Sequence, residues 1–387
     1  MSSRPSVALL IETSNGYARG LLEGIIAYVR AHDAWSIWLP EQRRGETPPA
    51  WLSRWKGQGV IARIETPEIA AAVQKLRVPV IDVSAARTLP DIPWAETDDA
   101  AMARLGCEHL AERGFRRLAF VGDPRFNWSK WRQMHFEAWC AEAGVECHVF
   151  PALPARRDSV AREGELLRDW LKTLPQPTGI LACYDIKAQL VLEICRELDI
   201  AVPEQVAVLG IDNDELLCNL CTPPLSSIQP DSRRTGYLAA ELLTRILAGE
   251  VVPPQAHLIP PLGVVTRRST DVLAIEDREV ATALRFIREH AREGIDVSDV
   301  LRVTPLSRRV LEGRFREALG RSPHQEILRV RLEHVCRLLT QTDLSLAEIA
   351  ARTGFAHPEY LTVAFKRELG QPPSVYRKEH TGGTPAE

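Results

Sequence analysis

The stretch DLSLAEIAARTGFAHPEYLTVAFKRELGQPPSVYR, from Asp343 to Arg377, decides the fold of the C-terminal part of this 387-residue chain. Its first half has apolar residues at helical spacing, which predicts a short amphipathic helix. These residues are Leu346, Ile349 and Ala350. Gly354 follows where a helix commonly ends through a left-handed residue, and Phe355 can then fill the gap behind the turn.

The second half of this stretch predicts a second helix. Pro358 can begin it, because the first turn of a helix does not need that residue's N–H group. Three apolar residues, four apart, form its predicted buried stripe: Leu361, Phe365 and Leu369. Gly370 is expected to end the helix. Two short helices joined by a tight turn are typical of a helix-turn-helix.

The same unit occurs a second time fifty residues upstream. FREALGRSP at residues 315–323 aligns with FKRELGQPP at residues 365–373, and Leu311 aligns with Leu361. An internal repeat indicates two copies of one supersecondary unit. The residues between the copies, 324–340, predict a connecting helix. Such a pair could enter two successive major-groove segments of DNA, about 34 Å apart.

Both copies together resemble the DNA-binding domain of the AraC/XylS family of transcription regulators, over residues 276–380. The upstream copy contributes LSRRVLEGRF and RVRLEHVCRLL to this resemblance. Gly313 departs from the family pattern, which usually carries a large residue there. A glycine inside a helix weakens it by about 1 kcal/mol relative to alanine.

The resemblance implies that residues at the start and outer face of each second helix contact DNA. These are Ser307, Arg308, Arg309, Glu312, His357, Glu359, Thr362, Lys366 and Arg367. Ser307 is expected to cap its helix, whereas His357 holds a capping position that usually takes Ser, Asp or Asn. Arg308 and Arg309 suit a guanine edge and a phosphate. Lys366 and Arg367 fit phosphate contacts or plain surface charge.

Composition agrees with this interpretation without deciding it. The net charge is −3, yet nine arginines and four glutamates lie between residues 302 and 337. This modest basic stripe is acceptable for binding phosphates. The N-terminal apolar run, residues 7–11, is too short for a signal peptide, and the sequence has no transmembrane stretch, so we expect a cytoplasmic protein.

Neither a metal site nor a catalytic motif is indicated. Of the eight cysteines, Cys218 and Cys221 form the one CxxC, and no second ligand pair lies nearby. The sequence also lacks HExxH, GxSxG, GxGxxG and P-loop patterns. We therefore expect no cofactor, no metal and no enzyme.

From residue 6 to about residue 266, strand-like and helix-like segments alternate. The predicted strands are 7–11, 59–62, 80–83, 118–122, 179–182 and 206–210. The predicted helices are 16–30, 68–76, 100–113, 185–198 and 232–248. This alternation is typical of parallel βαβ units, which bind ligands beyond the carboxyl ends of their strands.

Residues suited to a sugar follow these strands. A sugar offers hydroxyls and apolar C–H faces, so its site needs acceptors, a guanidinium donor and an aromatic platform. The candidates are Asn15, Tyr17, Trp128, Arg132, Tyr184, Asp185 and Asp212. The alternatives are a turn-capping role for Asp212, a solvated helix arginine for Arg132, and a core position for Trp128.

Four segments resemble the sugar-binding core of the LacI/GalR repressors, which is periplasmic-binding-protein-like. They are DDAAMARLGCEHLAERGFRRLAFVG, GILACYDIKA, VLGIDNDE and PPLSSIQPD. This resemblance implies that Arg132 and Asp212 hold sugar hydroxyls and that Trp128 stacks on the sugar. The LacI-type headpiece is expected to be missing, because the chain begins at the first strand.

The resulting prediction is a two-lobed α/β periplasmic-binding-protein-like domain followed by an all-α domain with two helix-turn-helices. We expect the first domain at 1–268, a linker at 269–276, the second domain at 277–380 and a disordered tail at 381–387. The combination resembles AraC/XylS regulators of the xylose type. It implies a homodimeric activator that binds double-stranded DNA, responds to xylose or a related pentose, and contacts RNA polymerase; repression is possible. The alternatives are a sugar receptor serving a transporter and a sugar-active enzyme, each with accessory C-terminal helices.

Overall fold

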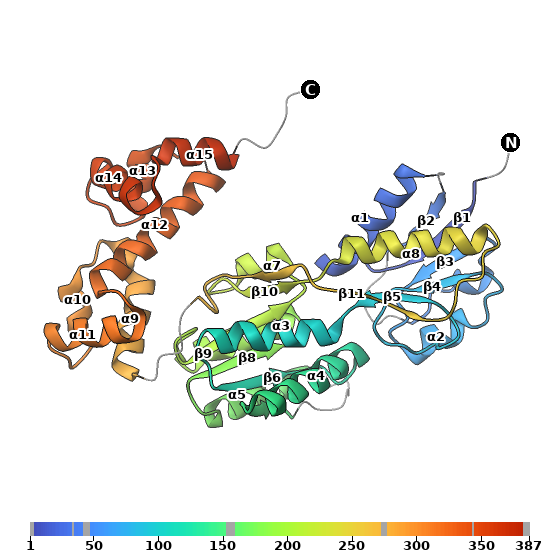
Figure 1. The fold of residues 1–387 in the computed structure, drawn as a ribbon, viewed down its shortest axis with the longest axis horizontal. Coiled ribbons are helices and arrows are strands. Elements are labelled where there is room, and N and C mark those ends of the chain that lie inside the picture. Colours follow the sequence, from blue (N-terminus) through green and yellow to red (C-terminus); the bar gives the residue numbers. More distant parts are fainter. Residues whose placement is uncertain are drawn as a thin grey trace. The chain divides into compact units, whose positions relative to one another are not determined.

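The computed structural model describes residues 4–32, 35–41, 47–151, 159–271, 277–342 and 344–381. The chain divides into two compact units, Met1–Ala274 and Ile275–Glu387. The first unit contains two six-stranded sheets, and the second consists of helices (Figure 1). This architecture confirms the predicted fold class.

The first sheet forms lobe 1 of the first unit, and its five strand pairs are parallel. Its strand order is β11-β5-β4-β3-β1-β2. The bounds are β1 Ser6–Leu10, β2 Ser36–Trp38, β3 Gly59–Ala62, β4 Val80–Asp82, β5 Trp94–Thr97 and β11 Ala256–Ile259. Its helices are α1 Gly16–Ala31, the short η1 Leu52–Arg54, α2 Pro67–Val73 and α8 Ser232–Leu247. Branched and aliphatic side chains from β1, β3 and β4 form its core on both faces.

The second sheet forms lobe 2 and has the order β12-β10-β9-β8-β6-β7. Its strands are β6 Arg117–Val121, β7 Glu146–Val149, β8 Thr178–Ala182, β9 Val206–Ile211, β10 Ser226–Gln229 and β12 Gly263–Val265. Strand β12 is antiparallel to β10, whereas the other pairs are parallel. The helices are α3 Asp99–Glu112, α4 Asn127–Ala143, α5 Ser159–Thr173, α6 Asp185–Glu197 and α7 Glu215–Leu220.

The chain passes between the lobes at three places. Helix α3 follows β5 of lobe 1 but packs on β8, β10 and β12 of lobe 2, and α8 follows β10 but packs on α1 of lobe 1. The third passage joins β11 to β12. Glycines allow the close approach of α1 and α8: a Cβ on Gly24 would lie 2.0 Å from the carbonyl oxygen of Arg233. The lobes are therefore joined by three connecting segments.

Agreement with the sequence is good for long periodic segments. The six predicted strands and five predicted helices are all present, with bounds shifted by at most three residues. Several elements of short or irregular pattern were not predicted from the sequence. These are β2, β5, β7, β10, β11, β12, α4, α5 and α7.

The second unit confirms the repeated helix-turn-helix. Helices α10 Val297–Arg302 and α11 Arg308–Leu319 form the first copy, and α13 Leu346–Arg352 and α14 Pro358–Leu369 form the second. The long helix α12, Pro323–Gln341, connects them, while α9 Arg278–His290, the short η2 Ala291–Glu293 and α15 Pro373–Thr381 complete the unit.

Backbone geometry supports the predicted ends of these helices. Gly354 has φ +76° and Gly370 has φ +77°, as expected for left-handed residues after a helix. Leu361 and Phe365 are fully buried, but Leu369 is 42% exposed. The prediction that Leu369 belongs to the buried stripe is therefore wrong, because it occupies the last residue of α14, where little packs over it.

The stretch between the units begins later than the sequence suggested. Ser269 and Thr270, placed in the linker by sequence, are fully buried in the first unit. The rest of that linker, residues 272–276, lies outside the described residues, and so do residues 382–387 of the expected tail. Thr381 is not part of a tail, since it is the last residue of α15.

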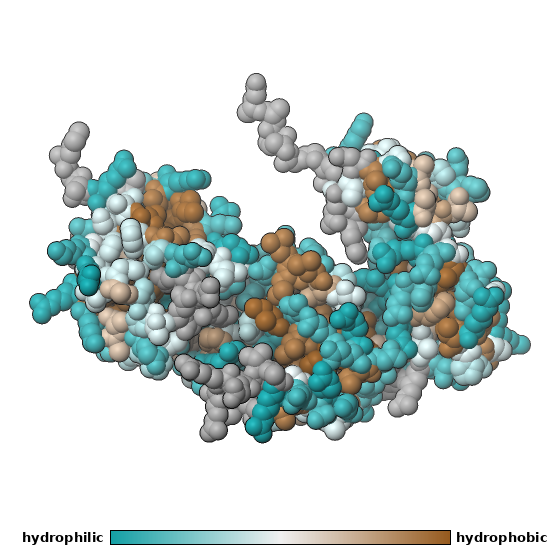
Figure 2. Space-filling model, turned by 180° about the vertical axis from the view of Figure 1, so that it is seen from behind, coloured by the Kyte–Doolittle hydropathy of each residue, from teal (hydrophilic) through white to brown (hydrophobic). Residues whose placement is uncertain are grey.

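Among the described residues, none of the helices has the length and hydropathy to cross a membrane. On the face shown in Figure 2, hydrophobic residues form separate patches within a hydrophilic surface. Two exposed leucines, Leu216 and Leu220, lie on α7.

Candidate functional site

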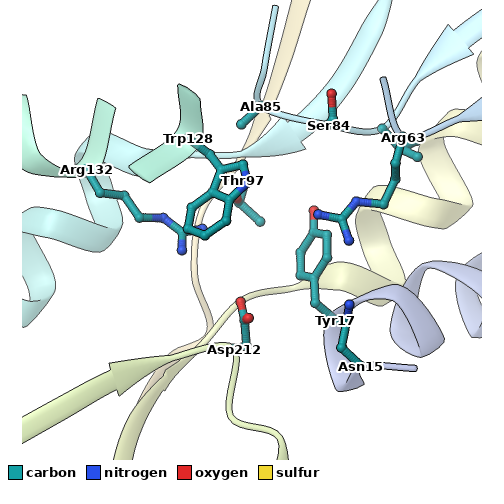
Figure 3. A pocket seen from close by; sticks show the side chains of 10 residues that line it. Asn15, Tyr17, Arg63, Ser84, Ala85, Thr97, Trp128, Arg132 and Asp212 are labelled. Carbon is teal, nitrogen blue, oxygen red and sulfur yellow. The ribbon is translucent and has the colours of Figure 1, made fainter. Parts of the chain in front are cut away.

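A pocket lies between the two lobes of the first unit. It is lined by Asn15, Tyr17, Arg63, Val83, Ser84, Ala85, Thr97, Trp128, Arg132 and Asp212. Figure 3 shows that the rings of Tyr17 and Trp128 and the carboxylate of Asp212 face the same space. The structure thus brings together five of the seven predicted ligand residues.

On the side of lobe 1, a buried charge cluster is centred on Arg63, which directly follows β3. Its guanidinium forms ion pairs with Glu12 and with Glu65, the latter at 2.6 Å. It also lies over the ring of Tyr17, 5.2 Å from the ring centroid. Burial, opposed by the Arg63 charge, raises the pKa of Tyr17, so its hydroxyl stays a hydrogen-bond donor. This cluster holds one cation and one phenol at the pocket wall.

Asn15 sits at the start of helix α1 and performs a structural task as well. Its side chain accepts a hydrogen bond from Ala18 N at 2.8 Å, which caps the helix. Its amide nitrogen donates to Glu12 Oε1, also at 2.8 Å. Both polar ends of Asn15 are therefore already engaged while it lines the pocket.

Trp128 reaches the pocket from the first turn of α4 in lobe 2. Its indole packs against Phe126 and Tyr184, with ring centroids 5.0 and 5.6 Å away. The guanidinium of Arg132 lies 4.9 Å from its ring centroid. Its Nε1 donates to Glu65 Oε1 of lobe 1 at 3.2 Å. Trp128 is thus a buried residue of the lobe 2 core that also lines the pocket.

Arg132 is buried and doubly held. Its Nε donates to Asp99 Oδ1 at 2.8 Å, and its Nη1 donates to the carbonyl oxygen of Cys183 at 2.6 Å. Burial alone would lower the pKa of Arg132, but Asp99 and Asp212 raise it. The alternative of a solvated surface arginine is wrong, because only 5% of the residue is exposed.

Asp212 follows β9 and has an unusual backbone. Its φ is +113°, and the next residue, Asn213, has φ +47°. Non-glycine residues avoid such values, and they persist where the surroundings fix them, often at binding sites. The backbone N–H groups of this loop are fixed accordingly: Asp212 N donates to Ile228 O and Asn213 N donates to Ser227 Oγ.

The other two predicted ligand residues, Tyr184 and Asp185, do not line the pocket. Tyr184 packs its ring edge-on against Trp128. Asp185 is buried and accepts hydrogen bonds from Asp214 N at 2.8 Å and Ser227 Oγ at 2.6 Å. Burial and the neighbouring Asp212 raise the pKa of Asp185 to about 8. Tyr184 thus packs against Trp128, and Asp185 holds the loop that carries Asp212.

Three polar pocket residues that follow or end strands of lobe 1 were not predicted from the sequence. Arg63 follows β3, Ser84 lies two residues beyond β4, and Thr97 ends β5. The rule used for the other candidates, polar residues at the carboxyl ends of strands, would have found Arg63. Thr97 lies on a strand that the sequence did not predict.

The predicted DNA-contacting residues lie along α11 and α14. Ser307 and His357 occupy the two N-cap positions, but neither side chain makes a capping hydrogen bond. Capping by Ser307, as expected from sequence, is therefore wrong. Arg308 forms an ion pair with Glu312 at 3.1 Å, and Arg309 is exposed.

In the second copy, Glu359, Lys366 and Arg367 are exposed on α14, and Arg367 pairs with Glu368. Thr362 is half-buried, and its hydroxyl donates to the carbonyl oxygen of Pro358 within its own helix. The sequence analysis did not choose Val363, which is 64% exposed on the same helix. An exposed apolar side chain at such a position suits contact with a thymine methyl group.

Three family models match the chain. The "XylR N-terminal domain" matches residues 6–100, the "Periplasmic binding protein-like domain" residues 107–270, and the "Helix-turn-helix domain" residues 300–379. The "Xylose operon regulatory protein" of Escherichia coli K12 is 35% identical, with 97% of each chain covered. That of Haemophilus influenzae is 32% identical over 96% of this chain and 97% of its own. The solved structure titled "structure of xylose-binding transcription activator xylR" superposes with a TM-score of 0.86 at 35% identity, covering 98% of this chain and 99% of that one.

Fold and site together define a transcription regulator in which a two-lobed sugar-binding domain precedes an AraC-type domain with two helix-turn-helices. Within that class, the chain belongs to the family of the xylose operon regulatory proteins.

Proposed function

We propose that this protein regulates sugar-utilisation genes and that its effector is a neutral monosaccharide, D-xylose or a related pentose. The sugar binds in the pocket between the lobes. The family relationship supports this assignment, since a relative of known structure is titled a xylose-binding activator.

The observation that carries the proposal is the distribution of donors, acceptors and rings around the pocket. Arg63 and Arg132 provide fixed donors, Asp212 provides an acceptor, and Tyr17 and Trp128 provide aromatic faces. Both arginines are already compensated by buried carboxylates: Glu12 and Glu65 for the first, and Asp99 for the second. With Asp212 added, the site has no excess positive charge, which favours hydroxyl groups over a phosphate or carboxylate.

Sugar binding closes the lobes about the three connecting segments. This closure changes how the helix-turn-helices of the two subunits bind DNA. A ligand shifts such an equilibrium only by its differential affinity for the two states, and a sugar that bridges both lobes has this property. The protein acts as a cytoplasmic homodimer that binds double-stranded DNA, and it activates transcription through RNA polymerase. Its function is binding, without a catalytic step or cofactor.

The test is selection of DNA by the full-length protein. Purified protein is mixed with sheared genomic DNA of its own source, with and without D-xylose, and the retained fragments are sequenced. Enrichment of fragments beside pentose-utilisation genes, strengthened by xylose in the parent but not in Asp212→Ala, is the expected result. Fragments without common sequence, or conversion of xylose into a product, would exclude the regulator.

A further inference from the structure

The last part of the first unit, residues 266–271, leads from strand β12 toward the DNA-binding unit. It is fixed to the body of lobe 2 rather than free. Ser269 Oγ donates to the carbonyl oxygen of Val208 at 2.6 Å and accepts from Ser226 N at 2.8 Å. Ser269 N also donates to the carbonyl oxygen of Pro224. We call residues 266–271 the exit segment.

A second set of contacts holds the exit segment from helix α3. Arg113 Nε donates to the carbonyl oxygen of Thr270 at 2.7 Å. The ring of His109 forms a hydrogen bond with Thr270 Oγ1 at 2.8 Å, and this hydroxyl bonds to Ser226 Oγ. Burial and the Arg113 charge lower the pKa of His109 to about 3, so its ring is neutral. None of these contacts involves the pocket loop.

Arg267 is different, because it bonds directly to the pocket loop. Its Nη1 donates to Asn213 Oδ1 at 2.8 Å and to the carbonyl oxygen of Leu225 at 3.1 Å. Asn213 is buried and is the immediate neighbour of Asp212. A single guanidinium therefore connects the exit segment to the residue beside the sugar-facing carboxylate.

This contact falls on the most strained part of the pocket. Asp212 and Asn213 both have positive φ, a conformation that costs free energy for such residues and persists only when the surroundings fix it. Backbone N–H groups at Asp212 and Asn213 are held by β10, and Asp214 N is held by Asp185. The Asn213 side chain is held from the exit segment.

We propose that Arg267 is a positioning residue for sugar binding and that its hydrogen bond to Asn213 couples the pocket to the exit segment. The part concerning sugar rests on the function proposed above. Arg267 helps to hold Asp212 in its binding conformation, and a sugar bound to Asp212 in turn orders residues 266–271. Thermodynamic linkage makes the two effects equal in size.

The test uses the full-length protein with Arg267→Met, Asn213→Gly and the double variant. Glycine replaces Asn213 because it tolerates φ +47° without strain. D-xylose affinity is measured by calorimetry, and amide hydrogen exchange is measured with and without the sugar. Each single variant is expected to bind xylose about fivefold more weakly, and the double variant no more weakly than the worse single one. In the parent, xylose should protect the amides of Ser269 and Thr270, and the variants should lose most of that protection.

Arg113→Met is the matched control. It removes a guanidinium that holds the same exit segment at Thr270 but does not contact the pocket loop. It should speed exchange at Thr270 but weaken xylose binding less than Arg267→Met does, because the hydrogen bond between Arg267 and Asn213 remains. Parental affinity in Asn213→Gly and Arg267→Met, or strictly additive losses in the double variant, would overturn the proposal.

The ligand-free measurements separate this proposal from the proposed function. If the parent binds no xylose, the assigned effector is wrong. The coupling is then decided without sugar. Asn213→Gly must speed exchange at Ser269 and Thr270, and Arg267→Met must speed exchange at residues 212–214 more than Arg113→Met does. Absence of these two effects would refute the coupling.

Discussion

The indole nitrogen of Trp128 donates a hydrogen bond to Glu65 Oε1 at 3.2 Å, from helix α4 of lobe 2 to the segment after β3 of lobe 1. The same carboxylate binds Arg63 at 2.6 Å. The aromatic platform and the cation of the pocket therefore share one buried acceptor. This acceptor links the two lobes directly at the pocket wall.

Two substitutions of Trp128 distinguish the contribution of its aromatic ring from that of its hydrogen bond to Glu65. Trp128→Phe keeps an aromatic face but loses the N–H that donates to Glu65 of the other lobe. Because this bond favours the closed lobes that bind the sugar, we expect xylose affinity to fall by about 1 kcal/mol, the net contribution of one hydrogen bond. Trp128→Ala also loses the face and should cost about 2 kcal/mol or more. Calorimetric titration with D-xylose measures both. Equal affinities for the two variants would show that the ring does not contact the sugar.

Removing the Arg63 charge should destabilise the first unit strongly. Arg63→Met leaves Glu12 and Glu65 buried without their cation, and we expect a loss of about 3–5 kcal/mol in the free energy of unfolding. The control Arg54→Met changes an exposed arginine of η1 and should stay within about 0.5 kcal/mol. Denaturant unfolding followed by circular dichroism compares them. A loss for Arg63→Met as small as that of the control would refute the charge cluster.

The buried Asp185 predicts a particular pH dependence. Burial and Asp212 raise its pKa from 3.8 to about 8, so the folded protein holds a proton that the unfolded chain has released. Stability must then fall as the pH rises from about 4 to about 8, by up to about 1.4 kcal/mol per pH unit for this group. Asp185→Asn cannot titrate, so its unfolding midpoint should fall less steeply between pH 5 and 8. Parallel pH profiles for parent and variant would contradict this.

Two glycines of the second unit should respond in opposite directions to alanine. Gly313 lies inside α11, and a Cβ there would meet nothing within 4 Å. Gly313→Ala should therefore stabilise the unit by about 1 kcal/mol through helix propensity. Gly354 has φ +76°, and its Cβ would lie 2.5 Å from the carbonyl oxygen of Ala291, so Gly354→Ala should destabilise by about 1–2 kcal/mol or more. Thermal unfolding of the full chain decides; a stabilising Gly354→Ala would contradict the assigned turn.

Substitutions in α11 and α14, the second helices of the two helix-turn-helices, can distinguish contacts to bases from contacts to phosphates. Lys366→Ala should weaken binding to all DNA sequences alike and reduce the slope of log affinity against log salt by about 0.9. Arg309→Ala should reduce the preference for selected over random DNA by about 1–3 kcal/mol. Fluorescence anisotropy at several salt concentrations distinguishes the two. Identical behaviour of both variants would show that Arg309 does not read a base.

Sequence reasoning was most successful where periodicity or spacing was strong. The repeat of FREALGRSP in FKRELGQPP revealed both helix-turn-helices, and the central strands of both sheets were evident from their apolar runs. Strand β5, WAET, was missed because it is only four residues long and a glutamate and a threonine interrupt its apolar pattern. Its Glu96 is fully buried, paired with Arg87, which no local pattern indicates.

Pocket residues could be predicted where they follow a predicted strand or match a family motif. They could not be predicted where their role depends on tertiary contacts. Asp212 and Arg132 came from strand ends and a family resemblance, and both line the pocket. Asp185 also follows a strand, but its carboxylate points to Asp214 N and Ser227 Oγ behind the loop. The two partners that orient the Asp185 carboxylate lie 29 and 42 residues away in sequence, so the sequence alone could not separate Asp185 from Asp212.

The most direct test of the central claim is thermal unfolding of the full-length protein with D-xylose and a panel of other pentoses, hexoses and uronic acids, beside Asp212→Ala. At a sugar concentration one hundred times the dissociation constant, binding stabilises the folded state by about 2.7 kcal/mol, which raises the midpoint by several degrees. We predict such a rise for D-xylose or a closely related pentose in the parent, a smaller or absent rise for uronic acids, and none in Asp212→Ala. No shift with any neutral monosaccharide at millimolar concentration, or an equal shift in Asp212→Ala, would contradict it.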